Sequence, residues 1–177
     1  KIFFFYNRFQ KLYEEMPSNV EFVNQMLTTD YLIRLTERDP SLMREGFAAV
    51  CDDLGQHVSR DTAELFTVMS TRLNCSVLFL THNLFNPRLA EHRLMSVNSK
   101  YTVIFKTVRD GQAVSRFGRQ LAGDVGGAAF DSIYKNACAL PHSYLFLDMT
   151  QEGDDRFRIR SNLFKENGKP ITVYQGI

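Results

Sequence analysis

Two adjacent carboxylates follow the apolar run FAAVC, and their type and position suit them to hold a cation. Asp52 and Asp53 come directly after Cys51. Mg²⁺ is a hard ion that takes oxygen ligands and keeps several waters, so one carboxylate at a strand end can hold it directly or through a water. The second carboxylate can then orient or deprotonate an attacking water. The alternative interpretation is a strand that ends in a solvated loop beginning with two acids.

Small polar residues follow a second apolar run, SVLFL, in the order Thr81, His82 and Asn83. Side chains of this kind can contact a phosphate group and position a water molecule. The alternative is that they only begin the next loop, with His82 exposed to solvent. No two of the four histidines have the spacing of paired zinc ligands, so the sequence does not predict a zinc site.

Arginines are frequent after the second apolar run, and a guanidinium group can stabilise the charge on a transferring phosphoryl group. Arg93 comes first, and Arg109 follows a third apolar run, YTVIF. Arg116 and Arg119 are three residues apart, which places them on one face of a predicted helix. For each arginine the alternative is a surface position with a weak salt bridge.

The elements that must position these residues are short apolar runs alternating with helical patterns. The runs IFFFY, FAAVC, VLFL and YLFL are apolar without alternation, which is typical of strands buried on both faces of a parallel sheet. The sequence therefore predicts an α/β fold, a mostly parallel sheet flanked by helices, in one domain over residues 1–177. Residues 144–147 and 157–159 are predicted to form an antiparallel hairpin at the sheet edge. The predicted helices cover residues 9–16, 31–37, 61–73, 112–121 and 128–139.

Three of the predicted strands, FAAVC, SVLFL and YTVIF, are followed by acids, small polar groups and cations respectively. In open α/β sheets, ligands bind outside the carboxyl ends of the strands. If the three strands are neighbours, their ends meet at one edge. This pattern favours a nucleotide-phosphate site over an apolar ligand pocket.

The overall composition narrows the class of protein. The chain has 177 residues, 44% of them hydrophobic, and a formal net charge of +1, which suits a globular domain and argues against a wholly cationic nucleic-acid binder. This composition is still compatible with a local basic face that binds nucleic acid. No apolar run approaches the roughly 20 residues of a membrane span, so no membrane partner is expected. Cys51, Cys75 and Cys138 lack CxxC spacing and are predicted to be buried thiols of a reducing compartment.

Taken together, the motifs resemble the viral DNA-packaging ATPases of the FtsK–HerA class. The resemblance is carried by FAAVCDDL, SVLFLTHNLF, SVNSKYTVIFKTVRD, SRFGRQL and PHSYLFLD, in this order. Relatives of this class occur in nucleocytoplasmic large DNA viruses, adintoviruses and Maverick/Polinton-like elements. The resemblance implies a RecA-like P-loop fold and a homo-oligomeric ring that hydrolyses ATP with Mg²⁺. It also implies double-stranded DNA and capsid proteins as partners, and a place in the host cytoplasm, the nucleus or the virion.

The resemblance also assigns roles to the residues after the first two runs. Asp52 takes the place of the Walker B acid that holds Mg²⁺, and Asp53 takes the place of the catalytic acid, where cellular relatives usually carry the longer Glu. Thr81 is implied to contact the nucleotide. His82 stands where the family commonly carries Gln, with Asn83 after it, and a histidine there makes the site sensitive to pH. Arg93, Arg109 and Arg119 lie at family-like positions for the arginine finger.

The main departure from the family is the missing phosphate loop, because GxxxxGK[ST] does not occur in the chain. The stretch Gly123–Phe130, GDVGGAAF, is rich in glycine but has no lysine and predicts a turn into a helix. In the family the phosphate loop precedes the strand that IFFFY resembles. We therefore expect an N-terminally incomplete ATPase domain that binds ATP weakly or not at all by itself.

Two other functions fit the same residues. One is a degenerate, non-catalytic α/β module that binds DNA or another protein. The other is a different P-loop ATPase, such as a helicase or a mobile-element ATPase. A phosphate loop within about a strand-loop-helix unit upstream of Lys1 would favour the motor over the degenerate module.

Overall fold

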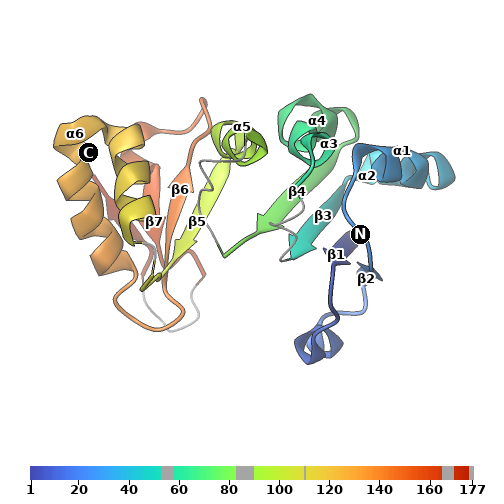
Figure 1. Ribbon diagram of the computed structural model, residues 1–177, viewed down its shortest axis with the longest axis horizontal. Helices are drawn as coiled ribbons and strands as arrows, with labels where there is room; N and C mark the ends of the chain where they lie inside the picture. Colours follow the sequence, from blue (N-terminus) through green and yellow to red (C-terminus); the bar gives the residue numbers. More distant parts are fainter. Residues whose placement is uncertain (53–57, 83–89, 110, 165–169, 176–177) are drawn as a thin grey trace. The chain divides into compact units, whose positions relative to one another are not determined.

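The computed structural model of the chain describes residues 1–52, 58–82, 90–109, 111–164 and 170–175, without the side chains of 124 and 125. It contains two compact units, residues 1–98 and residues 99–177. Each unit has its own four-stranded sheet (Figure 1). The α/β class and the parallel sheet flanked by helices are confirmed, whereas one domain over 1–177 stays a prediction.

The sheet of the first unit is parallel, with the strand order β2-β1-β3-β4. Strand β1 is the IFFFY run and lies between β2 and β3, and β3 pairs with β4, which contains the SVLFL run. The predicted strands of this part of the chain are therefore present and parallel. Their bounds are Ile2–Tyr6 for β1, Val20–Val23 for β2, Phe47–Asp52 for β3 and Cys75–Leu80 for β4.

One face of this sheet packs against the helices of the unit. Phe3 and Phe5 of β1 are fully buried there, together with Cys51 of β3 and leucines of the helices. Phe4 points to the opposite face and is also buried, so β1 is covered on both faces as predicted. The prediction of burial on both faces is wrong for the edge strand β4, where the side chains of Leu78 and Leu80 are 47% and 45% exposed.

Two helices of the first unit, α1 and α3, begin at side-chain caps that the sequence supplies locally. Thr28 accepts a hydrogen bond from the backbone N–H of Tyr31 at the start of α1, and Ser59 does the same for Thr62 at the start of α3. Such caps satisfy N–H groups that have no partner inside the helix. The helices of the first unit are α1 (Thr29–Arg38), α2 (Ser41–Glu45), α3 (Arg60–Glu64), α4 (Ser70–Arg72) and α5 (Ala90–Asn98).

Two predicted helices of this unit differ in detail from the structure. The helix predicted over 61–73 consists of α3, a π-helical segment at Leu65–Met69 and α4. Leu65, the first residue of the π segment, is fully buried. The helix predicted over 9–16 is only a 3₁₀ turn at Lys11–Glu15, because Pro17 leaves the segment too short for a stable α-helix.

The sheet of the second unit is antiparallel, with the order β5-β6-β7-β8. The YTVIF run, predicted as the next strand of the parallel sheet, is β5 and pairs antiparallel with β6, so that prediction is wrong. The antiparallel hairpin of β6 and β7 is confirmed. It is not at an edge, because β5 and β8 flank it. The bounds are Tyr101–Phe105 for β5, Tyr144–Asp148 for β6, Ile159–Ser161 for β7 and Thr172–Tyr174 for β8.

One face of the antiparallel sheet is covered by α6 (Gly111–Ala137), which bends at Gly123 (Figure 1). Gly123 has φ 69° and ψ −179°, a conformation that only glycine adopts at low cost. The two helical segments pack against each other, and the hydroxyl of Ser115 donates to both carboxylate oxygens of Asp131 at 2.9 and 3.0 Å. The two helices and the turn that the sequence predicts here are confirmed.

The three cysteines are free and buried, as the sequence predicts. In the part of the chain that the structure describes, no helix has both the length and the apolar character needed to cross a membrane.

Candidate functional site at the carboxyl edge of the parallel sheet

The candidate site lies where β3 and β4 end side by side. The parallel register pairs Asp52 with Leu80 on β4 and with Tyr6 on β1. Thr81 and His82 directly follow Leu80 and are exposed. The structure therefore brings Asp52, Thr81 and His82 to one edge of the sheet. Asp53 and Asn83 lie outside the described residues.

Asp52 is half-buried, and one of its carboxylate oxygens is engaged by a residue far away in the sequence. The hydroxyl of Tyr13, in the 3₁₀ turn, donates a hydrogen bond to Oδ2 of Asp52 over 2.5 Å. The strand register explains how Tyr13 meets Asp52. Tyr6 pairs with Asp52, and the side chains of both strand residues point to the face of the sheet that the 3₁₀ turn covers. Sequence reasoning missed Tyr13, and its only local signal was its place among aromatic residues.

Tyr13 is held in place by aromatic rings on this face of the sheet. Its ring centroid lies 5.0 Å from that of Phe4 and 5.3 Å from that of Phe9. It stacks on Phe22 with an interplanar angle of 18° and contacts Tyr6 at 5.6 Å. Tyr13 is only 3% exposed. We call Phe4, Tyr6, Phe9, Tyr13 and Phe22 the aromatic cluster.

The oxygen chemistry of this edge fits a magnesium ion bound together with a nucleotide. Mg²⁺ usually takes one or two carboxylates, and water and phosphate oxygens complete its coordination. Asp52 supplies one carboxylate, and Tyr13 engages its Oδ2, so Oδ1 is the atom that suits the cation. Among the described residues, no three His, Cys, Asp or Glu side chains cluster as an all-protein metal site. A bound Mg²⁺ would thus depend on Asp52 and the phosphates.

The cysteine that precedes Asp52 is not a reactive group. Burial raises the pKa of the Cys51 thiol to about 12, with a smaller contribution from the nearby Cys75. The thiol therefore stays protonated at neutral pH, and the thiolate is the form that attacks electrophiles or binds metals. The chemistry of this edge belongs to the oxygen and nitrogen side chains.

The predicted arginines are divided between the two units. Arg93 is exposed on α5, which packs in the first unit through His92 and Met95. Arg109 and Arg119 belong to the second unit. The sequence predicted that three neighbouring strand ends bring acids, polar groups and cations to one edge. This prediction is wrong, because β5 is not a neighbour of β3 and β4 in the parallel sheet. Only the first two strand ends are neighbours.

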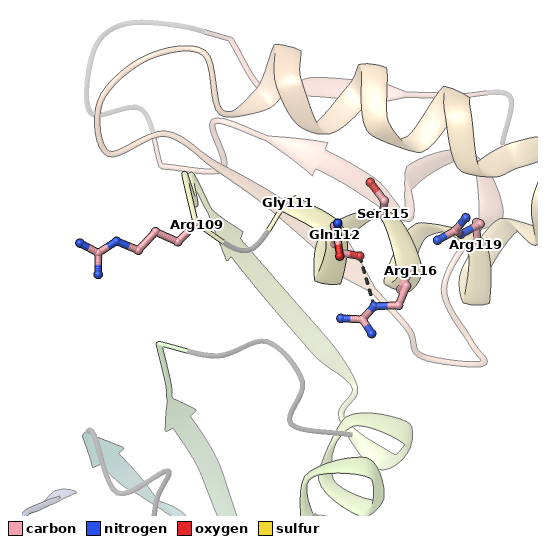
Figure 2. Close-up of a pocket in the computed structure, with 6 residues that line it drawn as sticks. All are labelled: Arg109, Gly111, Gln112, Ser115, Arg116 and Arg119. Carbon is pink, nitrogen blue, oxygen red and sulfur yellow. Dashed lines mark hydrogen bonds between the residues drawn. The ribbon is translucent and has the colours of Figure 1, made fainter. Parts of the chain in front are cut away.

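The second unit has an arginine-lined pocket at the start of α6, with a volume of about 680 Å³ (Figure 2). In Figure 2, Arg109 extends away from the helix, whereas Arg116 and Arg119 come from successive turns of it. The Nε of Arg116 donates to the backbone oxygen of Gln112 at 3.4 Å. Three guanidinium groups at one pocket can attract an anion. The lining residues are Arg109, Gly111, Gln112, Ser115, Arg116 and Arg119.

Comparisons with protein-family models, with curated proteins and with solved structures found no match for this chain. The class that the structure itself defines is an α/β protein with a four-stranded parallel sheet and a separate antiparallel sheet. Within this class, its particular feature is a parallel-sheet edge that carries Asp52 beside Thr81 and His82.

Proposed function

We propose that this chain is part of a Mg²⁺-dependent ATPase that translocates double-stranded DNA, of the kind that packages viral genomes. The observation that carries the proposal is the parallel pairing of β3 with β4, in which Asp52 lies opposite Leu80 and Thr81 follows at the same edge. An acid and a small polar residue at neighbouring strand ends suit a nucleotide with its magnesium ion. The RecA-like P-loop architecture, the homo-oligomeric ring and the capsid partners rest on the sequence resemblance alone.

In this proposal each residue has a defined task. Asp52 holds the magnesium ion, which when bound neutralises charge on the β- and γ-phosphates. Asp53 orients the attacking water and accepts its proton, and Thr81 contacts the γ-phosphate. His82 and Asn83 help to position the water. An arginine from Arg93, Arg109 or Arg119 stabilises the transferring phosphoryl group.

The test is ATP hydrolysis with and without Mg²⁺ and duplex DNA, in protein that includes any phosphate loop encoded upstream of Lys1. We expect DNA-stimulated turnover that Asp52→Ala and Asp53→Asn each abolish. Asp30→Asn is the matched control, because Asp30 is exposed on α1 and pairs with Arg34 on the same helix. Normal turnover in both acid variants excludes the proposal.

One observation favours the second candidate, a non-catalytic interaction or DNA-binding module. On β5, Tyr101, Val103 and Phe105 point away from α6 and are 56%, 44% and 58% exposed. A sheet face with several exposed apolar side chains is typical of an interaction surface. This candidate predicts no ATP hydrolysis under any condition of the same assay. It also predicts that Tyr101→Ser weakens binding to a partner while Asp52→Ala does not.

A further inference from the structure

The hydrogen bond between Tyr13 and Asp52 links a residue with no assigned role to the proposed cation site. We propose that Tyr13 is a positioning residue: its hydroxyl holds the Asp52 carboxylate through Oδ2 and keeps Oδ1 ready to bind the cation. This inference rests on the proposed function, because it requires Asp52 to bind Mg²⁺. It adds to that function a residue 39 positions away in the chain.

The aromatic cluster makes Tyr13 a rigid donor. Four rings contact the phenol ring, and the stacked partner Phe22 itself belongs to β2 of the same sheet. A tyrosine has few side-chain torsions, and the packing removes its freedom before any ligand arrives. The hydroxyl is therefore fixed relative to the strand that carries Asp52. Second-layer partners of metal-binding carboxylates act in this way, since they orient the ligand atom.

Charge and burial give a reason for the contact on this face. The Asp52 carboxylate is half-buried beside aromatic rings, where an ionised group is costly unless it is hydrogen-bonded. A hydroxyl that donates to a carboxylate makes a strong, charge-assisted hydrogen bond. Among the described residues, this hydrogen bond engages Oδ2 alone. It holds the acid in one orientation and leaves the other oxygen to bind the cation.

The matched comparison is between Tyr13→Phe and Tyr6→Phe. Both remove one hydroxyl from the aromatic cluster, but within the described residues only the Tyr13 hydroxyl donates a hydrogen bond to Asp52. Mn²⁺ replaces Mg²⁺ as the probe because its electron paramagnetic resonance spectrum reports both the free ion and the symmetry of the bound ion. The measurement uses protein that includes any phosphate loop encoded upstream of Lys1, with a non-hydrolysable ATP analogue present, at a temperature where circular dichroism shows each variant to be folded.

We expect wild-type protein to bind Mn²⁺ and Asp52→Asn to lose that binding. Tyr13→Phe should weaken Mn²⁺ binding roughly tenfold and alter the spectrum of the bound ion, whereas Tyr6→Phe should bind like the wild type. A purely structural hydroxyl would lower the melting temperature of Tyr13→Phe without changing Mn²⁺ affinity in the folded protein.

The outcomes separate the two proposals. If wild-type protein binds no Mn²⁺, or if Asp52→Asn binds as well as wild type, the cation site of the proposed function is refuted and the inference with it. If Asp52→Asn loses binding while Tyr13→Phe binds as tightly as wild type or more tightly, only the inference is overturned. If Tyr13→Phe does not fold, the second variant to test is Phe22→Leu, which keeps the Tyr13 hydroxyl but removes the ring stacked on it. It should then bind Mn²⁺ more weakly, and unchanged binding overturns the inference.

Discussion

Replacing Gly118 with alanine tests how closely the two helical segments of α6 pack. A Cβ atom at this position would lie 2.4 Å from Cδ1 and 2.7 Å from Cγ of Phe130. Phe130 is fully buried, so its ring cannot turn away into solvent. Overpacking of this kind costs about 1–3 kcal/mol, while alanine gains about 1 kcal/mol over glycine in a helix. The net cost is therefore about 0–2 kcal/mol. Because the overlap is with a ring and not with a flexible chain, we expect Gly118→Ala to fall in the upper half of this range and to destabilise the protein by about 1–2 kcal/mol.

Gly127→Ala is the matched control on the other segment of α6. Its Cβ would lie 2.6 Å from Cγ of Arg119. Arg119 is exposed, and its flexible side chain can rotate into solvent. The gain in helix propensity then remains, so this variant should be neutral or more stable than wild type by up to about 1 kcal/mol. The two substitutions are chemically identical, and only their neighbours in the tertiary structure differ.

The assay is urea unfolding followed by far-ultraviolet circular dichroism, with the free energy of unfolding obtained by linear extrapolation. A Gly118→Ala protein as stable as Gly127→Ala would refute the reasoning. The double variant Gly118→Ala with Phe130→Leu identifies the cause, because a smaller side chain relieves the overlap. We expect a coupling energy of at least about 0.5 kcal/mol between the two sites, which is the range for residues in contact.

Two further predictions concern the first unit. Asp61→Ala should lower the free energy of unfolding by about 1 kcal/mol in the same urea assay. The reason is that the Asp61 carboxylate accepts a hydrogen bond of 2.8 Å from the backbone N–H of Thr29 at the start of α1. An unchanged urea midpoint would contradict this prediction. Burial raises the pKa of Cys51 and of Cys75 from 9.0 to about 12. Their neutral thiols therefore stabilise the folded state below pH 9, and this contribution to stability is lost as the pH rises toward 12. A thiol reagent at pH 8.5 should therefore label both cysteines only after unfolding, and rapid labelling of the folded chain would argue against their burial.

The strands of the parallel sheet were predictable because their apolar runs are strong local signals. The side chains of a run such as IFFFY must be buried on both faces of the strand, and a parallel sheet covered by other elements allows this. The break at Gly123 was also predictable, since the glycine-rich stretch lies between two helical patterns. The place of Tyr101–Phe105 was not predictable, because a short run of aromatic and β-branched residues fits a parallel or an antiparallel neighbour equally well. Its pairing with Tyr144–Asp148 depends on contacts between residues distant in sequence.

Asp61 shows how the same limit applies to polar side chains. Asp61 lies in the first turn of α3, where a carboxylate can interact with the dipole of that helix. In the structure, its carboxylate instead caps α1, a different helix, while Ser59 caps α3. Helix caps follow local sequence only when cap and helix are neighbours in the chain. Side chains that bridge two elements depend on how those elements pack.

The sequence by itself determined which residues follow the strands and what chemistry they offer, because strand ends and carboxylates are local features. It placed Asp52 at the end of an apolar run and Thr81 at the end of another. Only the tertiary structure decided that these two ends are neighbours, and that Tyr13 donates a hydrogen bond to Asp52. A hydrogen bond across 39 residues has no periodic signal in the sequence, since it arises only when the packed sheet and turn bring the hydroxyl to the carboxylate.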